Sequence, residues 1–242
     1  MIVVDRLSFA YSDKEVLTDI SFTVEQKDFF AVLGPNAAGK TTLLKVMTGL
    51  LKQRDGKITI LNNDLSNVLS NNLKLQIGLM HDISGLYLKM TGFEYLSFIA
   101  AMYNYPPEKI TKRVSELSTL YKLDTEIHKP IKKYSAGTKK KVEFCATLVH
   151  EPKILFLDEP FESVDPSATY IMKKNLKLFV EDGGTVVITS HILESIQNLC
   201  NKYIIINGGS IVDEGNMDDL SIDLESRFME VIDSDNNNKE SV

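Results

Sequence analysis

The stretch GPNAAGKTT at residues 34–42 decides how this sequence is interpreted, and it follows directly on the apolar run FFAVL at 29–33. Its spacing is Gly-x-x-x-x-Gly-Lys-Thr. In such a loop the backbone N–H groups can surround a phosphate, because glycine tolerates the required φ and ψ and carries no Cβ. The alternative is an ordinary glycine turn before a helix. The residues of the candidate phosphate loop are Gly34, Pro35, Asn36, Ala37, Ala38, Gly39, Lys40, Thr41 and Thr42.

The segment after this loop strengthens the prediction. Residues 41–51 have the apolar spacing of an amphipathic helix, whose positive N-terminal end would face the same anion. Lys40 would reach the β- and γ-phosphates of a nucleotide, and the hydroxyl of Thr41 would ligate Mg²⁺. The pattern therefore predicts a site for a magnesium nucleotide.

The composition is that of a globular α/β protein. The chain has 242 residues, of which 43% are hydrophobic and 25% charged, and its formal net charge is −6. An acidic balance argues against a nucleic-acid partner, because nucleic-acid-binding domains usually carry a basic face. Cys145 and Cys200 lie in apolar helical patterns without metal-ligand spacing, so we expect buried free thiols.

Nothing in the sequence resembles a membrane span. No apolar run approaches the roughly 18 residues that a spanning helix needs, and charges at Asp5 and Arg6 make the N-terminus unlike a signal peptide. We expect a cytoplasmic protein that reaches a membrane, if at all, through a partner.

The hydrophobic pattern predicts an α/β fold. Strands are expected at 2–8, 17–24, 29–33, 57–61, 76–80, 153–160, 185–190 and 202–207, with a last strand after 208–215. Helices are expected at 41–51, 91–103, 108–121, 136–149, 167–181 and 192–200. Strands that alternate with helices favour a parallel sheet, in which ligands bind beyond the carboxyl ends of the strands. Residues 84–145 form a mostly helical insert in this pattern.

Two further motifs carry chemistry. ILFLDEP at 154–160 ends an apolar strand with Asp158, which could hold Mg²⁺, and Glu159, which could polarise a water as general base. YSAGTKKK at 134–141 opens a helix and could form a second anion site. The alternatives are a pair of capping acids in the first case, and an N-cap at Ser135 with a solvated lysine run in the second.

Taken together, these motifs resemble the ATP-binding subunit of an ABC (ATP-binding cassette) transporter, from Tyr11 to about Asp219. GPNAAGKTT is similar to the phosphate loop of that family, YSAGTKKK to its signature, and ILFLDEP to its second phosphate-site motif. ESVDP at 162–166 is similar to the D-loop, and TSHILES at 189–195 to the switch-histidine region.

The resemblance implies a P-loop NTPase fold and a set of residue roles. The expected architecture is an ATPase domain at 1–221, with a mostly parallel sheet, an N-terminal antiparallel β subdomain and the inserted α-helical subdomain. A C-terminal extension at 222–242 follows, whose tail from 233 is expected to be disordered. Tyr11 would stack on adenine, and His191 would contact the γ-phosphate or the catalytic water. Asp82 would act in catalysis and at the metal.

The resemblance also implies a head-to-tail dimer, either a homodimer or a heterodimer, with ATP between the subunits. The phosphate loop of one subunit would face the signature of the other. Ser135, Ala136 and Gly137 would then contact the nucleotide of the other subunit, and Ser163 and Asp165 would communicate across the dimer.

The sequence departs from the family pattern at three positions. Ala37 replaces a common glycine of the phosphate loop, a change that is tolerable if its φ stays negative. Ala136 replaces the first signature glycine, while Gly137 keeps the second. Asp82 stands where the family has glutamine or often glutamate, with His81 as the neighbouring candidate.

The resemblance favours an ATPase subunit that drives a separate membrane permease, at the inner face of the membrane. The segment ISGLYLKMTGFEYLSF at 83–98 resembles the permease-contacting region of exporter-type subunits, which favours export. One alternative is a soluble ABC ATPase of DNA repair or translation. Another is a nucleotide sensor that no longer hydrolyses ATP, against which Lys40, Asp158, Glu159 and His191 argue.

Overall fold

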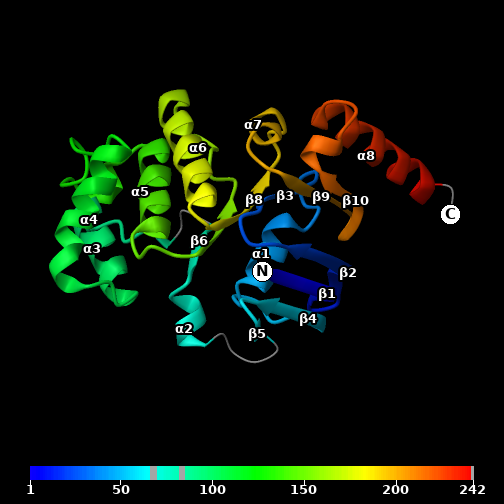
Figure 1. The fold of residues 1–242 in the computed structure, drawn as a ribbon, viewed down its shortest axis with the longest axis horizontal. Helices are drawn as coiled ribbons and strands as arrows, with labels where there is room; N and C mark the ends of the chain where they lie inside the picture. The colour runs from blue at the N-terminus through cyan, green and yellow to red at the C-terminus, as the bar shows by residue number, and fades with distance from the viewer. Residues whose placement is uncertain (66–69, 82–84, 241–242) are drawn as a thin grey trace. The chain divides into compact units, whose positions relative to one another are not determined.

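The computed structural model describes residues 1–65, 70–81 and 85–240. Contacts between residues divide the chain into two compact units. The first unit comprises Met1–Leu73 and Thr185–Val242, and the second comprises Lys74–Gly184. Each unit is described separately (Figure 1).

The first unit begins with an antiparallel sheet in the strand order β2-β1-β4-β5. Its strands are β1 (Ile2–Tyr11), β2 (Lys14–Val24), β4 (Asp55–Ile60) and β5 (Asn63–Asp64). The β1–β2 hairpin is tighter than the sequence predicts, because the strands continue to a two-residue turn at Ser12 and Asp13. Ser12 has a φ of 51°, the left-handed conformation that short hairpin turns require.

The second sheet of the first unit is mainly parallel. Strand β3 (Phe29–Leu33) pairs in parallel with β8 (Thr185–Ser190) and β9 (Lys202–Asn207), and β10 (Ser210–Asn216) pairs antiparallel with β9. Every residue of β3 and β8 is buried. Burial of both faces explains the continuous apolar runs from which these strands are predicted.

The helices of the first unit differ most from prediction at their ends. Helix α1 (Lys40–Met47) stops before Gly49, whose φ of 69° ends it, whereas the apolar pattern continues to residue 51. Helix α7 (Glu194–Gln197) is shorter than predicted, and a 3₁₀ turn at Met217–Asp219 follows β10. Apolar spacing alone therefore overestimates helix length.

The C-terminal tail differs from the expected disorder, because α8 (Leu224–Glu240) continues as a helix. Asp223 caps its start by accepting from the Ser226 N–H at 2.9 Å. Arg227 forms a bidentate ion pair with Asp213 of β10, at 2.7 and 2.9 Å. The Arg227–Asp213 ion pair is a tertiary contact that joins this polar helix to β10, which the local sequence does not reveal. Figure 1 shows α8 as the last helix of the chain.

The second unit combines a parallel strand pair with helices. Strand β6 (Ile77–Met80) pairs in parallel with β7 (Ile154–Asp158). The short helix α2 (Asn71–Lys74) precedes β6 and contains the boundary between the two units. Helices α3 (Gly92–Met102), α4 (Pro107–Leu120) and α5 (Ala136–Leu148) lie next to one another, drawn in green in Figure 1. A 3₁₀ turn (Ile131–Lys133) precedes α5, and α6 (Pro166–Glu181) follows β7.

Local signals explain where these helices start. Thr91 and Glu94 form a reciprocal capping box at α3, and a proline occupies the first position of both α4 and α6. The predicted fold class is confirmed: the chain is α/β, with parallel pairing among β3, β8 and β9 and between β6 and β7, and an antiparallel N-terminal sheet. Both cysteines are buried and neither forms a disulfide, as predicted.

Candidate functional site

The phosphate loop lies between the buried strand β3 and helix α1, as its sequence predicts. Gly34 has a φ of 154°, and a Cβ on it would lie 2.2 Å from the carbonyl oxygen of Ile206 in β9. Gly39, with a φ of 109°, precedes the first residue of α1. Both glycines are therefore required by the backbone path, because a side chain at either position would be strained or would clash.

Lys40 is buried in this loop, with 7% of its surface exposed. Its Nζ donates to the carbonyl oxygens of Gly34 at 2.7 Å and Pro35 at 3.0 Å. These bonds hold the ammonium group inside the loop, beside the N-terminus of α1. A fixed cation at the positive end of a helix dipole favours an anion such as phosphate.

Ala37 does not keep the negative φ that the sequence analysis assumes. Its φ is 64°, and the Ala38 N–H donates to the Pro35 carbonyl at 3.2 Å. Ala37 is thus the third residue of a four-residue turn, the position at which a type II turn favours glycine. The left-handed conformation costs a residue with a Cβ about 1–2 kcal/mol. The closed turn imposes this conformation, which local sequence reasoning missed.

The other predicted residues of the first unit surround the same strand ends. Thr41 and Thr42 follow Lys40 in α1, and Thr41 is exposed. His191 follows β8, and the register pairs Leu33 with Ser190, so Gly34 and His191 leave adjacent parallel strands at the same edge. The structure therefore brings the phosphate loop and His191 to one edge of this sheet.

Tyr11, at the end of β1, is 46% exposed. Its ring contacts Phe9 edge-on, with 4.8 Å between the ring centroids. A T-shaped pair covers at most one face of the Tyr11 ring, and stacking on a base requires only one face.

In the second unit, Asp158 and Glu159 lie at the carboxyl end of β7. Asp158 is the last residue of the strand and is 6% exposed. Glu159 is less buried and has a φ of 46°, an unusual conformation for a residue with a Cβ. Such a sharp bend turns the Glu159 side chain away from the direction of the strand. Strained backbone of this kind concentrates at functional sites.

The signature segment opens α5. Ser135 is the N-cap, and its Oγ accepts from the Thr138 N–H at 3.1 Å. Ala136 is exposed and Gly137 is partly buried. Asp165 caps α6 by accepting from the Ala168 N–H at 2.9 Å. Ser135 is thus the N-cap that the sequence offered as an alternative to an anion site, and Asp165 is also an N-cap.

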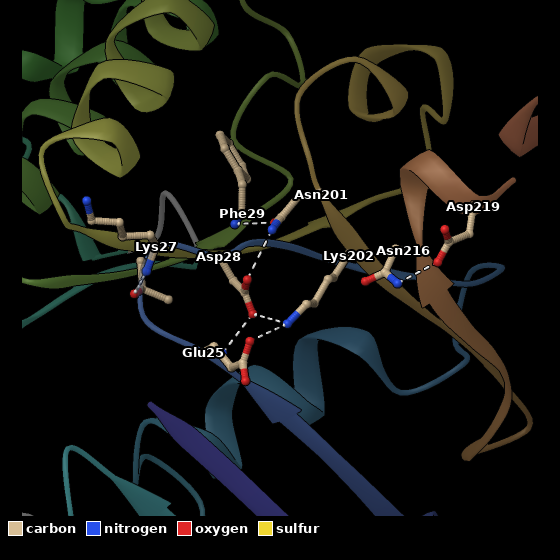
Figure 2. Close-up of polar contacts among 9 residues, drawn as sticks. Glu25, Lys27, Asp28, Phe29, Asn201, Lys202, Asn216 and Asp219 are labelled. Carbon is tan, nitrogen blue, oxygen red and sulfur yellow. Dashed lines mark hydrogen bonds and ion pairs between the residues drawn. The ribbon is translucent and has the colours of Figure 1, made fainter.

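A buried polar cluster at the opposite end of β3 escaped the sequence analysis (Figure 2). Asp28 is 4% exposed and accepts from the Glu25 N–H at 2.7 Å and from Asn201 Nδ2 at 3.0 Å. Lys202 Nζ lies 3.1 Å from Asp28 Oδ2, and the Phe29 N–H donates to Asn201 Oδ1 at 2.7 Å. A hydrogen bond to Glu25, together with Asp28, raises the pKa of Lys202.

This cluster lies at the opposite end of β3 from the phosphate loop. It joins the first residues of β3 and β9. These two strands then pair in parallel from Phe30–Lys202 to Leu33–Ile205. The next residue in β9 is Ile206, the residue against which Gly34 packs. The signal in the sequence is a single acid before one apolar strand and an Asn-Lys pair before another, which is too common to be diagnostic.

Magnesium chemistry fits the oxygen donors that the chain offers, the Thr41 hydroxyl and the Asp158 carboxylate. Within the described ranges, no three or more His, Cys, Asp or Glu side chains lie close enough together to hold a metal ion by themselves. Mg²⁺ usually binds one or two protein ligands together with waters and substrate phosphates, so it does not need such a group. Asp82, the remaining predicted ligand and catalytic residue, lies outside the described residues.

Each described helix is too short or too polar to cross a membrane.

The sequence profile of the ABC transporter family matches residues 17–162. An ABC transporter ATP-binding protein of Nostoc sp. is 33% identical over 89% of this chain, which spans 64% of that relative's length. YhcH of Bacillus subtilis, also an ABC transporter ATP-binding protein, is 32% identical, over 87% of this chain and 68% of its own length.

Solved structures give the same result. One described as the ATP-binding subunit of an ABC transporter is 26% identical with a TM-score of 0.89, covering 96% of this chain and 99% of that one. CbiO1 of Clostridium perfringens, described as part of the CbiONQ transporter complex, is 28% identical with a TM-score of 0.76, covering 89% and 88%. The chain therefore belongs to the ABC transporter family and is similar to its ATP-binding proteins.

Proposed function

We propose that this chain binds ATP with Mg²⁺ and hydrolyses it, as the ATP-binding subunit of a transporter whose permease is a separate protein. The observation that carries the proposal is Lys40, a buried cation held by the carbonyls of Gly34 and Pro35 beside the N-terminus of α1. A buried charge is costly unless the site uses it, and phosphate is the anion that this loop geometry accepts.

The proposed chemistry divides the phosphoryl-transfer tasks among these residues. Backbone N–H groups of the loop and Lys40 bind the β- and γ-phosphates. Thr41 and Asp158 would hold Mg²⁺, which neutralises developing charge on the phosphate oxygens. Glu159 accepts the proton of the attacking water, and His191 orients that water or the γ-phosphate.

The remaining sequence-predicted residues complete the proposal. Tyr11 stacks on the adenine ring through its exposed face. Asp82, at the family's glutamine position, acts through the metal or a bridging water, because a carboxylate directly beside the γ-phosphate would be repelled.

The proposed active form is a head-to-tail dimer. The chain has two anion-binding segments, the phosphate loop and the signature segment Ser135–Gly137, each at the start of a helix. In the dimer each segment completes a site with the opposite segment of the other subunit, so that ATP joins the two. Asp165 and Ser163 then lie at the subunit boundary.

The proposed partner is a membrane permease, which places the subunit at the inner face of the membrane. Exposed apolar side chains lie just before α3, at Tyr87 and Leu88, and along it, at Phe98 and Met102. The linearmycin resistance protein LnrL of Bacillus subtilis is 30% identical over 91% of this chain. Because this relative is named for resistance, it supports export of a small molecule, rather than import, as the direction of transport.

A pull-down and an ATPase assay test this proposal together. The tagged chain, expressed in its own cells, should hydrolyse ATP in a Mg²⁺-dependent manner and should copurify a protein with several membrane spans. Hydrolysis without any such partner would favour a soluble ABC ATPase. Tight ATP binding without hydrolysis, with or without the permease, would favour a nucleotide sensor.

A further inference from the structure

We propose that Gly137 positions the loop that carries Glu159 within its own chain, in addition to any contact with the nucleotide of the other subunit. The inference rests on the proposed function, since it assigns a positioning residue for the same hydrolysis. The starting observation is a glycine within a helix. Gly137 lies in the first turn of α5, where glycine is less favourable than alanine by up to about 1 kcal/mol.

Packing in the second unit explains why glycine is needed there. A Cβ built on Gly137 would lie 2.6 Å from the carbonyl oxygen of Ser163 and 3.8 Å from the Cα of Val164. The first distance is well inside van der Waals contact, and the atom it meets belongs to the backbone. An alanine at 137 would therefore have to move the backbone at 163, because no side chain can rotate away.

The loop at 159–165 transmits such a movement to Glu159. The Glu162 N–H donates to the Glu159 carbonyl and the Val164 N–H to the Phe161 carbonyl, each at 3.3 Å. These two turns overlap. Both Glu159 and Ser163 have positive φ, at 46° and 61°. A loop bent this tightly has few alternative conformations, so a shift at Ser163 changes the direction of the Glu159 side chain.

The far end of the loop is anchored and cannot absorb the shift. Asp165 caps α6 through the Ala168 N–H at 2.9 Å, and Lys122, just after the end of α4, donates to Ser167 at 2.9 Å. Phe161 is buried under the ammonium group of Lys173 of α6, which lies 5.2 Å from the ring centroid. The displacement is therefore directed toward Glu159.

Mixed dimers separate action within a chain from action across the dimer. In the first, one subunit carries Gly137→Ala and its partner carries Lys40→Ala. The remaining competent site then uses the Lys40 and Glu159 of the Gly137→Ala chain with an unaltered signature segment. Our inference predicts that its kcat falls about 10- to 100-fold, the usual effect of a misplaced catalytic group, with KM for ATP nearly unchanged.

The second mixed dimer carries both substitutions in one subunit and none in the other, so the competent site contains an unaltered Glu159. The reference is a dimer with Lys40→Ala in one subunit only. Full activity of the first dimer relative to this reference would overturn the inference, whatever the second one does. A reference dimer without any hydrolysis would instead contradict the proposed function.

Gly85→Ala is the matched control, because a Cβ at Gly85 has no atom within 4 Å. Without the permease, it should keep the ATPase activity of the parent chain. Hydrogen exchange without ATP tests the contact independently of hydrolysis and of dimer formation. Gly137→Ala should speed exchange at the N–H groups of Glu162, Val164 and Ala168, and Gly85→Ala should not. Unchanged exchange at these three amides would overturn the inference.

Discussion

The phosphate loop and the signature segment both place a glycine at the start of a helix, but their shapes depend on contacts of different range. The phosphate loop is closed largely by its own residues, since Lys40 binds the carbonyls of Gly34 and Pro35, although Gly34 also packs on Ile206 of β9. The signature segment has a local cap at Ser135, whereas its glycine packs on Ser163 of a distant segment. A motif whose shape depends on its own residues can be recognised from its spacing in the sequence. The shape of a motif that depends on distant contacts cannot be fully predicted from that spacing.

The largest expected effect tests the locally held loop. Replacing Lys40 by Ala removes a charge that would make at least two charge-assisted hydrogen bonds to the phosphates, each worth about 1.5–3 kcal/mol. We expect ATP affinity to fall by roughly 10²–10⁴ and hydrolysis to be lost, as measured by calorimetry and phosphate release. Lys45→Ala removes the same charge from the last turn of the same helix and should bind ATP normally. Normal affinity in a folded Lys40→Ala chain would contradict the phosphate-loop assignment.

The second-largest effect is expected at Glu159, in the loop at 159–165 whose shape depends on tertiary contacts. Glu159→Gln keeps the shape of the side chain and removes its basicity, so ATP should still bind while hydrolysis slows by roughly 10²–10⁴. The variant should accumulate as a dimer with ATP, which size-exclusion chromatography measures. Glu116→Gln, on the exposed face of α4, is the control for charge. Hydrolysis at the parent rate would show that Glu159 is not the base.

A smaller effect tests the strain in the phosphate loop. Ala37→Gly should relieve the left-handed strain at a φ of 64°. Part of that gain is offset by the greater entropy of glycine in the unfolded chain. The free energy of unfolding should therefore rise by about 1 kcal/mol or less, measured by urea titration. Ala38→Gly should lower it, because Ala38 is buried and has no positive φ to relieve. A destabilised Ala37→Gly variant would show that the turn does not strain Ala37.

The smallest effect tests a long-range contact of the second unit. His150 is 9% exposed, its ring stacks on Tyr103 at 3.8 Å, and its Nε2 lies 3.0 Å from the Ile77 carbonyl oxygen. Burial lowers its pKa, with a further contribution from the positive charge of Arg113. The unfolded chain then binds a proton at higher pH than the folded chain. The stability that neutral His150 supplies is complete above pH ~6.5 and is lost as pH falls toward the lowered folded-state pKa.

His150→Phe keeps the aromatic stacking and removes the titration. The loss of unfolding free energy between about pH 7.5 and pH 5.5 should be smaller in this variant than in the parent chain. An equal loss would mean that His150 does not titrate differently in the folded and unfolded chains.

Most of the fold could be predicted from the sequence, because strand periodicity and helix caps act within a few residues. The strands at 29–33, 185–190 and 202–207 match the structure at both ends, since each is a continuous apolar run between polar residues. Predictions were less accurate where tertiary contacts extend or shorten an element. Helix α8 runs through residues 233–240, where the tail is expected to be disordered, and Asp235 accepts from Asn207 Nδ2 at 2.7 Å. Helix α1 ends early at Gly49.

The sequence by itself determined the phosphate loop, the acids after β7 and the order of the motifs, because each depends on residue type and short spacing. Only the tertiary structure decided the conformation of Ala37, the burial of Asp28 with Asn201 and Lys202, and the contact of Gly137 with Ser163. These features depend on which distant backbone atoms meet a given position. Spacing along the chain carries no information about those atoms until the chain has folded.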